Sequence, residues 1–248
     1  MTSDETHSSP KIIYDLGSNN GDDIPYYLLK AEKVIAVEAN IKLCELIAAR
    51  FQSEVSQNRL IIENCAITES RDGEIDFYLH NQYHVLSSLL APSTGKERYF
   101  TKTTVKAISV ASLIKKHGSP YYAKIDIEKY DENILSAFAV NQIVPPYISA
   151  ESHTIGVFAL LSEKLPYSSF KLVEGKSVSR TYQNTLLYSP ILEKHCVYSF
   201  PHHSAGPFGN DIHGEWMTKE ALLKLLALHG LGWKDIHASR LDKPTLSF

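Results

Sequence analysis

The sequence predicts an α/β protein in which a mostly parallel sheet carries helices on both faces, in a Rossmann-like arrangement. Two observations predict it. Short apolar runs alternate with amphipathic segments of helical length, and the first apolar run leads through a glycine-rich turn into a helix. The sequence has no internal repeat, low-complexity tract or linker, so we expect one domain over 11–248 after a flexible tail over 1–10.

The individual elements follow from short apolar runs bounded by turns and from longer amphipathic segments. The expected strands are 11–16, 33–38, 59–64, 74–79, 102–108, 121–126, 146–151, 168–174 and 184–189. The expected helices are 22–32, with Pro25 in its first turn, 40–53, opening at Asn40, and then 109–117, 131–140, 155–164 and 218–229. The irregular segments of about 80–100 and 199–215 are predicted to be loops that cover the site.

Composition excludes several classes of protein. The 248 residues are 44% hydrophobic and 21% charged, with a formal net charge of −3 and no block of basic residues, so nucleic acid is not expected as a partner. Cys44, Cys65 and Cys196 stand too far apart for a thiolate zinc site and indicate a reducing, cytoplasmic setting. No signal peptide or membrane-spanning stretch is evident, so we expect no membrane partner. The oligomeric state stays open, a homodimer included.

The turn after the first strand reads Asp15-Leu-Gly17-Ser-Asn19-Asn-Gly21. Glycines in such a turn let the backbone pass close to a ligand and bend sharply into the helix. Glu38 ends the second strand, where a carboxylate can accept hydrogen bonds from a ribose diol. The pattern predicts an adenosine-bearing ligand and leaves NAD and S-adenosylmethionine as alternatives.

Asp15 favours S-adenosylmethionine, because a carboxylate at this turn repels a pyrophosphate and attracts an ammonium or sulfonium group. The turn also departs from the G-x-G-x-x-G pattern of dinucleotide-binding proteins. The competing interpretation is structural: Asp15 and Asn19 cap the first helix, and Gly21 is a turn glycine.

Four stretches, YDLGSNNGDDIPYYL, VIAVEAN, NCAITESRDGEIDFY and YYAKIDIEKYDENIL, together resemble the FkbM-type methyltransferases over about residues 11–153. The resemblance implies a seven-stranded class I methyltransferase fold, S-adenosylmethionine as methyl donor, and O-methylation of a hydroxyl on a sugar or natural product. It also implies contacts with the cofactor: Asp15, Gly17, Asn19 and Gly21 around the methionyl part, Glu38 at the ribose, and Cys65 and Ala66 near the adenine. Family members commonly read K-I-D-x-E-G-x-E, whereas Lys129, Tyr130 and Asp131 follow Glu128 here. We therefore expect an altered loop beside the acceptor and do not carry over the acceptor's identity.

Candidate catalytic residues follow two neighbouring strands. Asp126 and Glu128 end one, and Glu151 and His153 end the next, so the four side chains are expected at one mouth beside the cofactor. Methyl transfer to an alcohol needs alignment and a base, and one of these residues could supply that base. Two alternatives remain: a Mg²⁺ or Mn²⁺ site, which we do not expect, and a structural ion pair of Lys124 with Asp126 or Glu151.

The cap loops carry further polar side chains, which we interpret as substrate contacts or solvated groups: His80, Tyr83, His84, Ser87, Ser88, His202, His203, Asp211 and His213. The predicted activity is methyl transfer to a small-molecule or glycan acceptor. The alternatives are an NAD-dependent oxidoreductase and a non-catalytic nucleoside-binding Rossmann domain.

Overall fold

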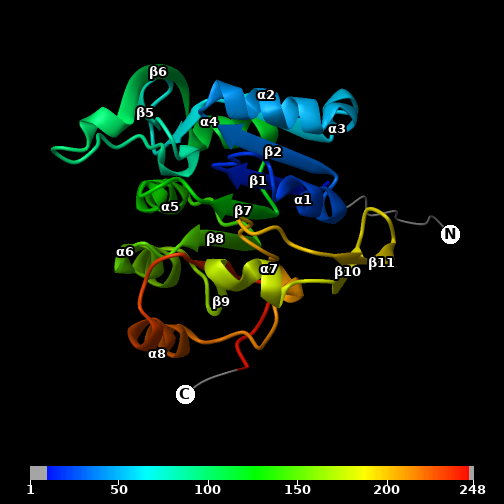
Figure 1. Cartoon of the computed structure of the whole chain (residues 1–248). Coiled ribbons are helices and arrows are strands. Elements are labelled where there is room, and N and C mark those ends of the chain that lie inside the picture. Colours follow the sequence, from blue (N-terminus) through cyan, green and yellow to red (C-terminus); the bar gives the residue numbers. More distant parts are fainter. Residues whose placement is uncertain (1–9, 246–248) are drawn as a thin grey trace.

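A seven-stranded sheet runs through the middle of the molecule in this computed structural model, which describes residues 10–245 (Figure 1). The strand order is β3-β2-β1-β7-β8-β12-β9, and all neighbours are parallel except that β12 runs antiparallel to β8 and β9. The strands are β1 Ile12–Leu16, β2 Lys33–Glu38, β3 Leu60–Asn64, β7 Tyr122–Ile125, β8 Tyr147–Glu151, β9 Ser169–Glu174 and β12 Lys234–Ser239. The predicted α/β fold class with a mostly parallel sheet is confirmed.

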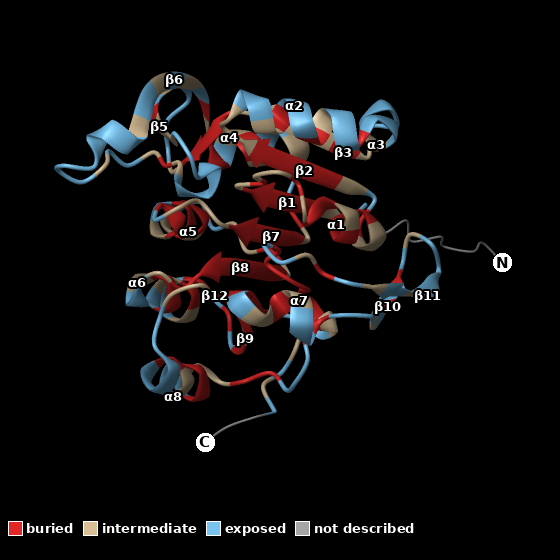
Figure 2. Ribbon diagram, viewed as in Figure 1, coloured by how far each residue is buried: buried red, intermediate tan, exposed pale blue. Residues whose placement is uncertain are grey.

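Helices cover both faces of this sheet. They are α1 Ile24–Lys30, α2 Ile41–Arg50, α3 Gln52–Ser56, α4 Val110–His117, α5 Asp131–Val140, α6 Ile155–Ala159, α7 Val178–Thr181 and α8 Lys219–His229. One apolar layer packs the sheet against α4, α5, α6 and α8, and the other packs it against α1, α2 and α7. Strand β1 serves both layers, because Tyr14 and Leu16 point into one and Ile13 into the other. The central strands are accordingly buried (Figure 2).

Local sequence signals fix several helix ends. The Asn40 side chain accepts a hydrogen bond from the Lys42 amide at 3.1 Å, which begins α2 at the predicted residue. Thr218 caps α8 in the same way through the amide of Ala221 at 3.3 Å. The single helix expected over 40–53 is instead broken at Phe51 into α2 and α3.

Strand β12 was not predicted, and the strand expected over 184–189 has a different place. The sequence of β12 includes the polar residues Asp235 and His237, so it lacks the apolar pattern of a buried strand, although both side chains are buried. The 184–189 strand does not join the central sheet; as β10 Thr185–Ser189 it forms a separate hairpin with β11 Lys194–Tyr198. A third sheet, β4-β6-β5, completes the set, with β4 Ala66–Thr68, β5 Gly73–His80 and β6 Phe100–Ser109.

The predicted tail over 1–10 lies, apart from Pro10, outside the described residues, and the one-domain division over 11–248 stays a prediction. Within residues 10–245, no helix combines the length and the apolar character that crossing a membrane requires.

The turn that leaves β1 depends on a close approach between two main-chain segments. Gly17 has a φ of +85°, and a Cβ atom at this position would collide with the main-chain carbonyl oxygen of Asp126. Gly95 has nearly the same φ, +86°, but a Cβ atom there would have no heavy atom within 4 Å. The two glycines therefore separate the cost of the backbone conformation from the cost of the collision.

We expect Gly95→Ala to lower the free energy of unfolding by about 1 kcal/mol, because only the left-handed conformation is penalised. Gly17→Ala should lose a further 1–3 kcal/mol or so, since the β1 turn must move away from β7. Urea denaturation of both variants measures the difference. Equal losses of the free energy of unfolding in the two variants would show that the main chain at Asp126 moves away from the added Cβ atom at no cost.

Candidate functional site

A cavity of about 580 Å³ lies where β1, β2, β7 and β8 end. Nine of the eleven residues predicted for the cofactor and for catalysis line it: Gly17, Asn19, Glu38, Cys65, Ala66, Asp126, Glu128, Glu151 and His153. Asp15 and Gly21 do not line it. The carboxyl ends of neighbouring parallel strands thus bring together side chains that are far apart in the sequence.

The glycine turn is fastened to the end of β2. The amides of Gly17 and Ser18 donate to the Val37 carbonyl at 3.0 and 3.1 Å, and the Asn19 amide donates to the Glu38 carboxylate at 2.9 Å. Since Gly17 faces the Asp126 carbonyl and Gly21 faces the side chains of α1 and α2, these glycines serve the approach of chain segments to one another. Gly17 also lines the cavity, so the expectation that a glycine here lets the backbone pass close to a ligand stays a prediction.

Glu38 joins the turn and the start of α2 as well as lining the cavity. One carboxylate oxygen accepts the Asn19 amide and the other accepts the Asn40 amide at 2.7 Å. Burial raises the pKa of Glu38 to about 7, although the hydrogen bonds from these amides and the charge of Lys124 lower it. A carboxylate has about four acceptor positions, so two main-chain bonds leave capacity for hydroxyl donors of a ligand.

Lys124 lies at the floor of the cavity between two carboxylates. Its Nζ is 3.3 Å from Asp15 Oδ1 and 3.2 Å from Asp126 Oδ2, and it donates to the Gly17 carbonyl at 3.0 Å. Burial lowers the pKa of Lys124, but the carboxylates around it outweigh burial and hold that pKa well above its usual value. Burial raises the pKa of Asp15, and Lys124 opposes the rise. Lys124 thus forms the ion pair with Asp126 that the structural alternative predicted, and it forms a second ion pair with Asp15. The other pair that this alternative named, between Lys124 and Glu151, is not found among the described residues.

The other candidate catalytic residues, Glu128, Glu151 and His153, also line the cavity. His153 Nε2 is 2.9 Å from Glu151 Oε2, and this contact, with the charge of Glu151, raises the pKa of His153 to about 9 against the opposing effect of burial. Burial also raises the pKa of Glu128, which His153 and Lys129 lower. The carboxylate of Glu128 accepts no hydrogen bond from residues 10–245, and Lys129 Nζ is 3.9 Å away.

The loop after β7 retains a conformation that glycine adopts without strain. Lys129, which stands where family members commonly carry glycine, has a φ of +67°. Its side chain is 69% exposed. Ser88 fastens the same loop by donating to the Glu128 carbonyl at 2.9 Å.

The segment after β5 contributes Tyr83, His84 and Ser87 to the cavity wall, while Ser88 holds the β7 loop from outside the cavity. In the second cap loop, His203 lines the cavity and Asp211 instead accepts a hydrogen bond from Tyr26 at 2.7 Å. No group of His, Cys, Asp and Glu side chains within the described residues is placed to hold a metal ion.

Several lining residues were not predicted. Leu43 and Phe77 have no chemical signature, and their apolar side chains read as core. Trp233 precedes β12, the unrecognised strand, so nothing local in the sequence placed it near the strand ends. Burial raises the pKa of Cys65 to about 12, which keeps this lining thiol protonated at neutral pH.

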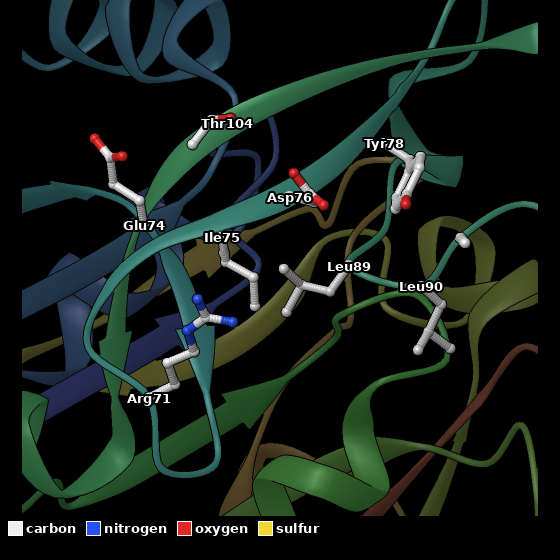
Figure 3. A pocket seen from close by; sticks show the side chains of 9 residues that line it. Arg71, Glu74, Ile75, Asp76, Tyr78, Leu89, Leu90 and Thr104 are labelled. Atoms are coloured by element: carbon white, nitrogen blue, oxygen red, sulfur yellow. The ribbon is translucent and has the colours of Figure 1, made fainter.

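A second hollow of about 390 Å³ lies beside β5 and the segment 88–91 (Figure 3). Asp76, Tyr78 and Leu90 are among the side chains around it, and Leu89 lines both this hollow and the main cavity. None of the predicted site residues lines this second hollow.

The model of the methyltransferase FkbM domain matches residues 15–164, which is more than half of the 248 residues, so the chain belongs to this methyltransferase family. The resemblance inferred from the sequence motifs is confirmed.

Two solved structures are similar to the chain. Methyltransferase FkbM from Methylobacillus flagellatus KT has 15% identity and a TM-score of 0.44, over 66% of this chain and 40% of that one. StiE O-MT has 13% identity and a TM-score of 0.41, over 96% of this chain and 69% of that one. The chain thus spans less than half the length of the Methylobacillus protein. None of the curated proteins matches the sequence.

Replacing Lys124 by methionine should lower the free energy of unfolding by about 3–5 kcal/mol, because Asp15 would stay buried without a cation. The second change Asp15→Asn in the same chain should recover a large part of this loss. Lys102→Met is the matched control: its ion pair with Asp76 at 2.8 Å is more than half exposed, so its removal should have little effect on the free energy of unfolding. Similar losses for Lys124→Met and Lys102→Met in chemical denaturation would contradict the central role of Lys124.

Proposed function

We propose that this chain transfers a methyl group from S-adenosylmethionine to a hydroxyl of a small-molecule or glycan acceptor. One observation carries the proposal: a single cavity contains both the turn that suits an adenosine cofactor and the carboxylates that suit an alcohol acceptor. Bound S-adenosylmethionine would supply the reactive methyl group on its sulfonium centre. The chain's own residues would bind the two molecules, align them and remove a proton.

Polar atoms at the cofactor end of the cavity suit the ligand. Glu38 offers a half-buried carboxylate that is already oriented by two main-chain amides, as a ribose diol requires. The Oδ1 atom of Asn19 is buried and has no hydrogen-bond partner among the described residues. An unpaired buried acceptor costs free energy, and a donor such as an ammonium group would relieve that cost.

The charge of the cavity supports a sulfonium cofactor over a dinucleotide. Its lining includes one lysine, which already faces two carboxylates, and six acidic residues: Asp22, Asp23, Glu38, Asp126, Glu128 and Glu151. A pyrophosphate would meet strong repulsion here, whereas an ammonium and a sulfonium would be attracted. The NAD-dependent oxidoreductase is therefore the weaker alternative.

Glu128 is the residue that we assign as the base. His153 keeps its proton at neutral pH because the pKa is about 9, so it acts as a positive charge paired with Glu151. Glu128 has a raised pKa, lines the cavity and has a carboxylate free of hydrogen bonds from the described residues. A carboxylate with a raised pKa is a stronger base, and it is ionised once the pH exceeds that pKa.

The cofactor assignment predicts a pH-dependent affinity for S-adenosylhomocysteine. Because the pKa of Glu38 is about 7, the carboxylate is charged above this pH and accepts the ribose hydroxyls best there. Affinity should therefore weaken as the pH falls through 7. Glu38→Gln should lower the affinity about tenfold on the alkaline side and flatten the dependence, since an amide is a weaker acceptor than a carboxylate.

Isothermal titration calorimetry on both sides of neutral pH measures these affinities. Glu45→Gln is the matched control, because Glu45 is exposed on α2 and does not line the cavity. Asp23, with a pKa raised to about 6 by burial, also titrates in the cavity, so only the part of the slope that Glu38→Gln removes is ascribed to Glu38. Equal affinities for Glu38→Gln and Glu45→Gln would overturn the ribose assignment.

The assignment of the base predicts a loss of turnover without a loss of cofactor binding. Glu128→Gln should reduce the release of S-adenosylhomocysteine by about 10²-fold or more, while the affinity for that product changes little. Glu163→Gln, on the exposed surface, is the control. Turnover at the wild-type rate in Glu128→Gln would exclude this role. If S-adenosylmethionine binds but no S-adenosylhomocysteine is formed with any tested alcohol, the non-catalytic alternative is favoured.

A further inference from the structure

An aromatic surface lies at the acceptor end of the cavity. Trp233 and His203 line the same cavity as Glu128, Glu151 and His153. Both residues come from the C-terminal part of the chain, beyond the residues 15–164 that the family model matches. Neither has a part in the mechanism proposed above.

Trp233 is held beside the end of β8 by an irregular step in the strand pairing. The Ser152 amide donates to the Lys234 carbonyl at 2.7 Å, but the Ser152 carbonyl accepts from Gly232 at 3.0 Å. Trp233 is thus the extra residue between two bonded neighbours, an arrangement that redirects a side chain out of the sheet. Ser152 itself separates Glu151 from His153, so the main chain around Trp233 lies beside the segment that carries that ion pair.

Two more contacts define the orientation of the indole. A Cβ atom at Gly175 would collide with the pyrrole part of Trp233, and the Gly175 amide donates to the Trp233 carbonyl at 3.1 Å, so the ring lies directly against this glycine. His203 is nearly parallel to the indole, with an interplanar angle of 19° and ring centroids 5.9 Å apart. His202 packs edge-on against His203 with centroids 4.7 Å apart. We call the two parallel rings the Trp233–His203 wall.

The wall and the neighbouring carboxylates together specify the chemistry of a ligand. A flat aromatic surface attracts the apolar face of a ring, and carboxylates accept hydrogen bonds from hydroxyl groups at its edge. An anionic ligand would be repelled by Asp126, Glu128 and Glu151. The suitable ligand is an uncharged ring that carries several hydroxyls.

We infer that the Trp233–His203 wall is the acceptor-binding surface, and that the acceptor presents an uncharged polyol ring of the pyranose type, which stacks on it. This inference rests on the proposed function, because the ring is an acceptor only if the chain transfers a methyl group to it. The binding of a ring at the wall can nevertheless be measured without turnover. Trp233 and His203 then determine specificity, while Glu128 receives the proton of the hydroxyl that is methylated.

The chain offers a direct test, because Trp216 and Trp233 are its only tryptophans. A ¹⁵N-labelled sample therefore has two indole signals, which Trp216→Phe assigns. In the presence of S-adenosylhomocysteine, millimolar methyl β-D-glucopyranoside, methyl β-D-galactopyranoside or methyl α-D-mannopyranoside is titrated, with the acyclic polyol D-glucitol as the comparison. At least one pyranoside should shift the Trp233 signal and leave the Trp216 signal in place, and D-glucitol should shift neither.

Variants then test the wall itself. Trp233→Ala should weaken pyranoside binding about tenfold or more, and Trp233→Phe should restore most of the affinity, since a phenyl ring still stacks. His203→Ala should have an intermediate effect. His195→Ala, an exposed histidine of β11 outside the cavity lining, should have none. The affinity for S-adenosylhomocysteine should stay within about twofold in all four, because neither aromatic residue is assigned to the cofactor.

The outcomes separate the two proposals. If S-adenosylhomocysteine binds and no pyranoside shifts the Trp233 signal, or if Trp233→Ala binds the pyranoside as wild type does, the inference about the wall is overturned. If pyranosides shift the Trp233 signal but S-adenosylhomocysteine does not bind, the wall stands and the proposed cofactor fails.

Discussion

The buried ammonium group of Lys124 is the contact on which the geometry of the site depends. It joins Asp15 in β1 to Asp126 at the end of β7 and also donates to the Gly17 carbonyl. A buried charge is tolerated only with close partners, so these groups must stay together while the chain is folded. The contact thereby fixes how far the glycine turn lies from the end of β7, and both of these segments line the cavity.

The sequence was sufficient for features that follow from local patterns. The strand, glycine turn and helix around Gly17, and the position of Glu38 at the end of β2, follow from the spacing of apolar and turn residues. The gathering of Glu128 and Glu151 followed because parallel neighbours end at one edge. Strand β12 could not be found, because it carries Asp235 and His237, and apolar patterning cannot identify a strand whose buried side chains are polar.

Other parts of the site depend on main-chain geometry that side-chain chemistry does not reveal. Lys129 suggested an altered loop because it stands in place of a glycine, and its left-handed φ of +67° could not be inferred from the residue type. Glu38 was predicted to bind the ribose, but its carboxylate also accepts hydrogen bonds from the amides of Asn19 and Asn40 and so holds the glycine turn against the start of α2. Asp15 was placed beside the cofactor from its charge, its position in the glycine turn and the family resemblance; in the structure it does not line the cavity, and its carboxylate lies 3.3 Å from the ammonium group of Lys124.

The C-terminal segment and the cofactor turn are built against each other. Asp23, at the start of α1, accepts hydrogen bonds from the Ser204 hydroxyl and from the Ala205 amide, the latter at 3.2 Å. His203 directly precedes Ser204, so the aromatic wall is anchored to the helix that follows the glycine turn. Because packed interiors transmit strain, the segment that carries His203 cannot move without displacing the start of α1, to which it is hydrogen-bonded. The cofactor end therefore constrains the space left for the acceptor, although the residues concerned come from opposite ends of the chain.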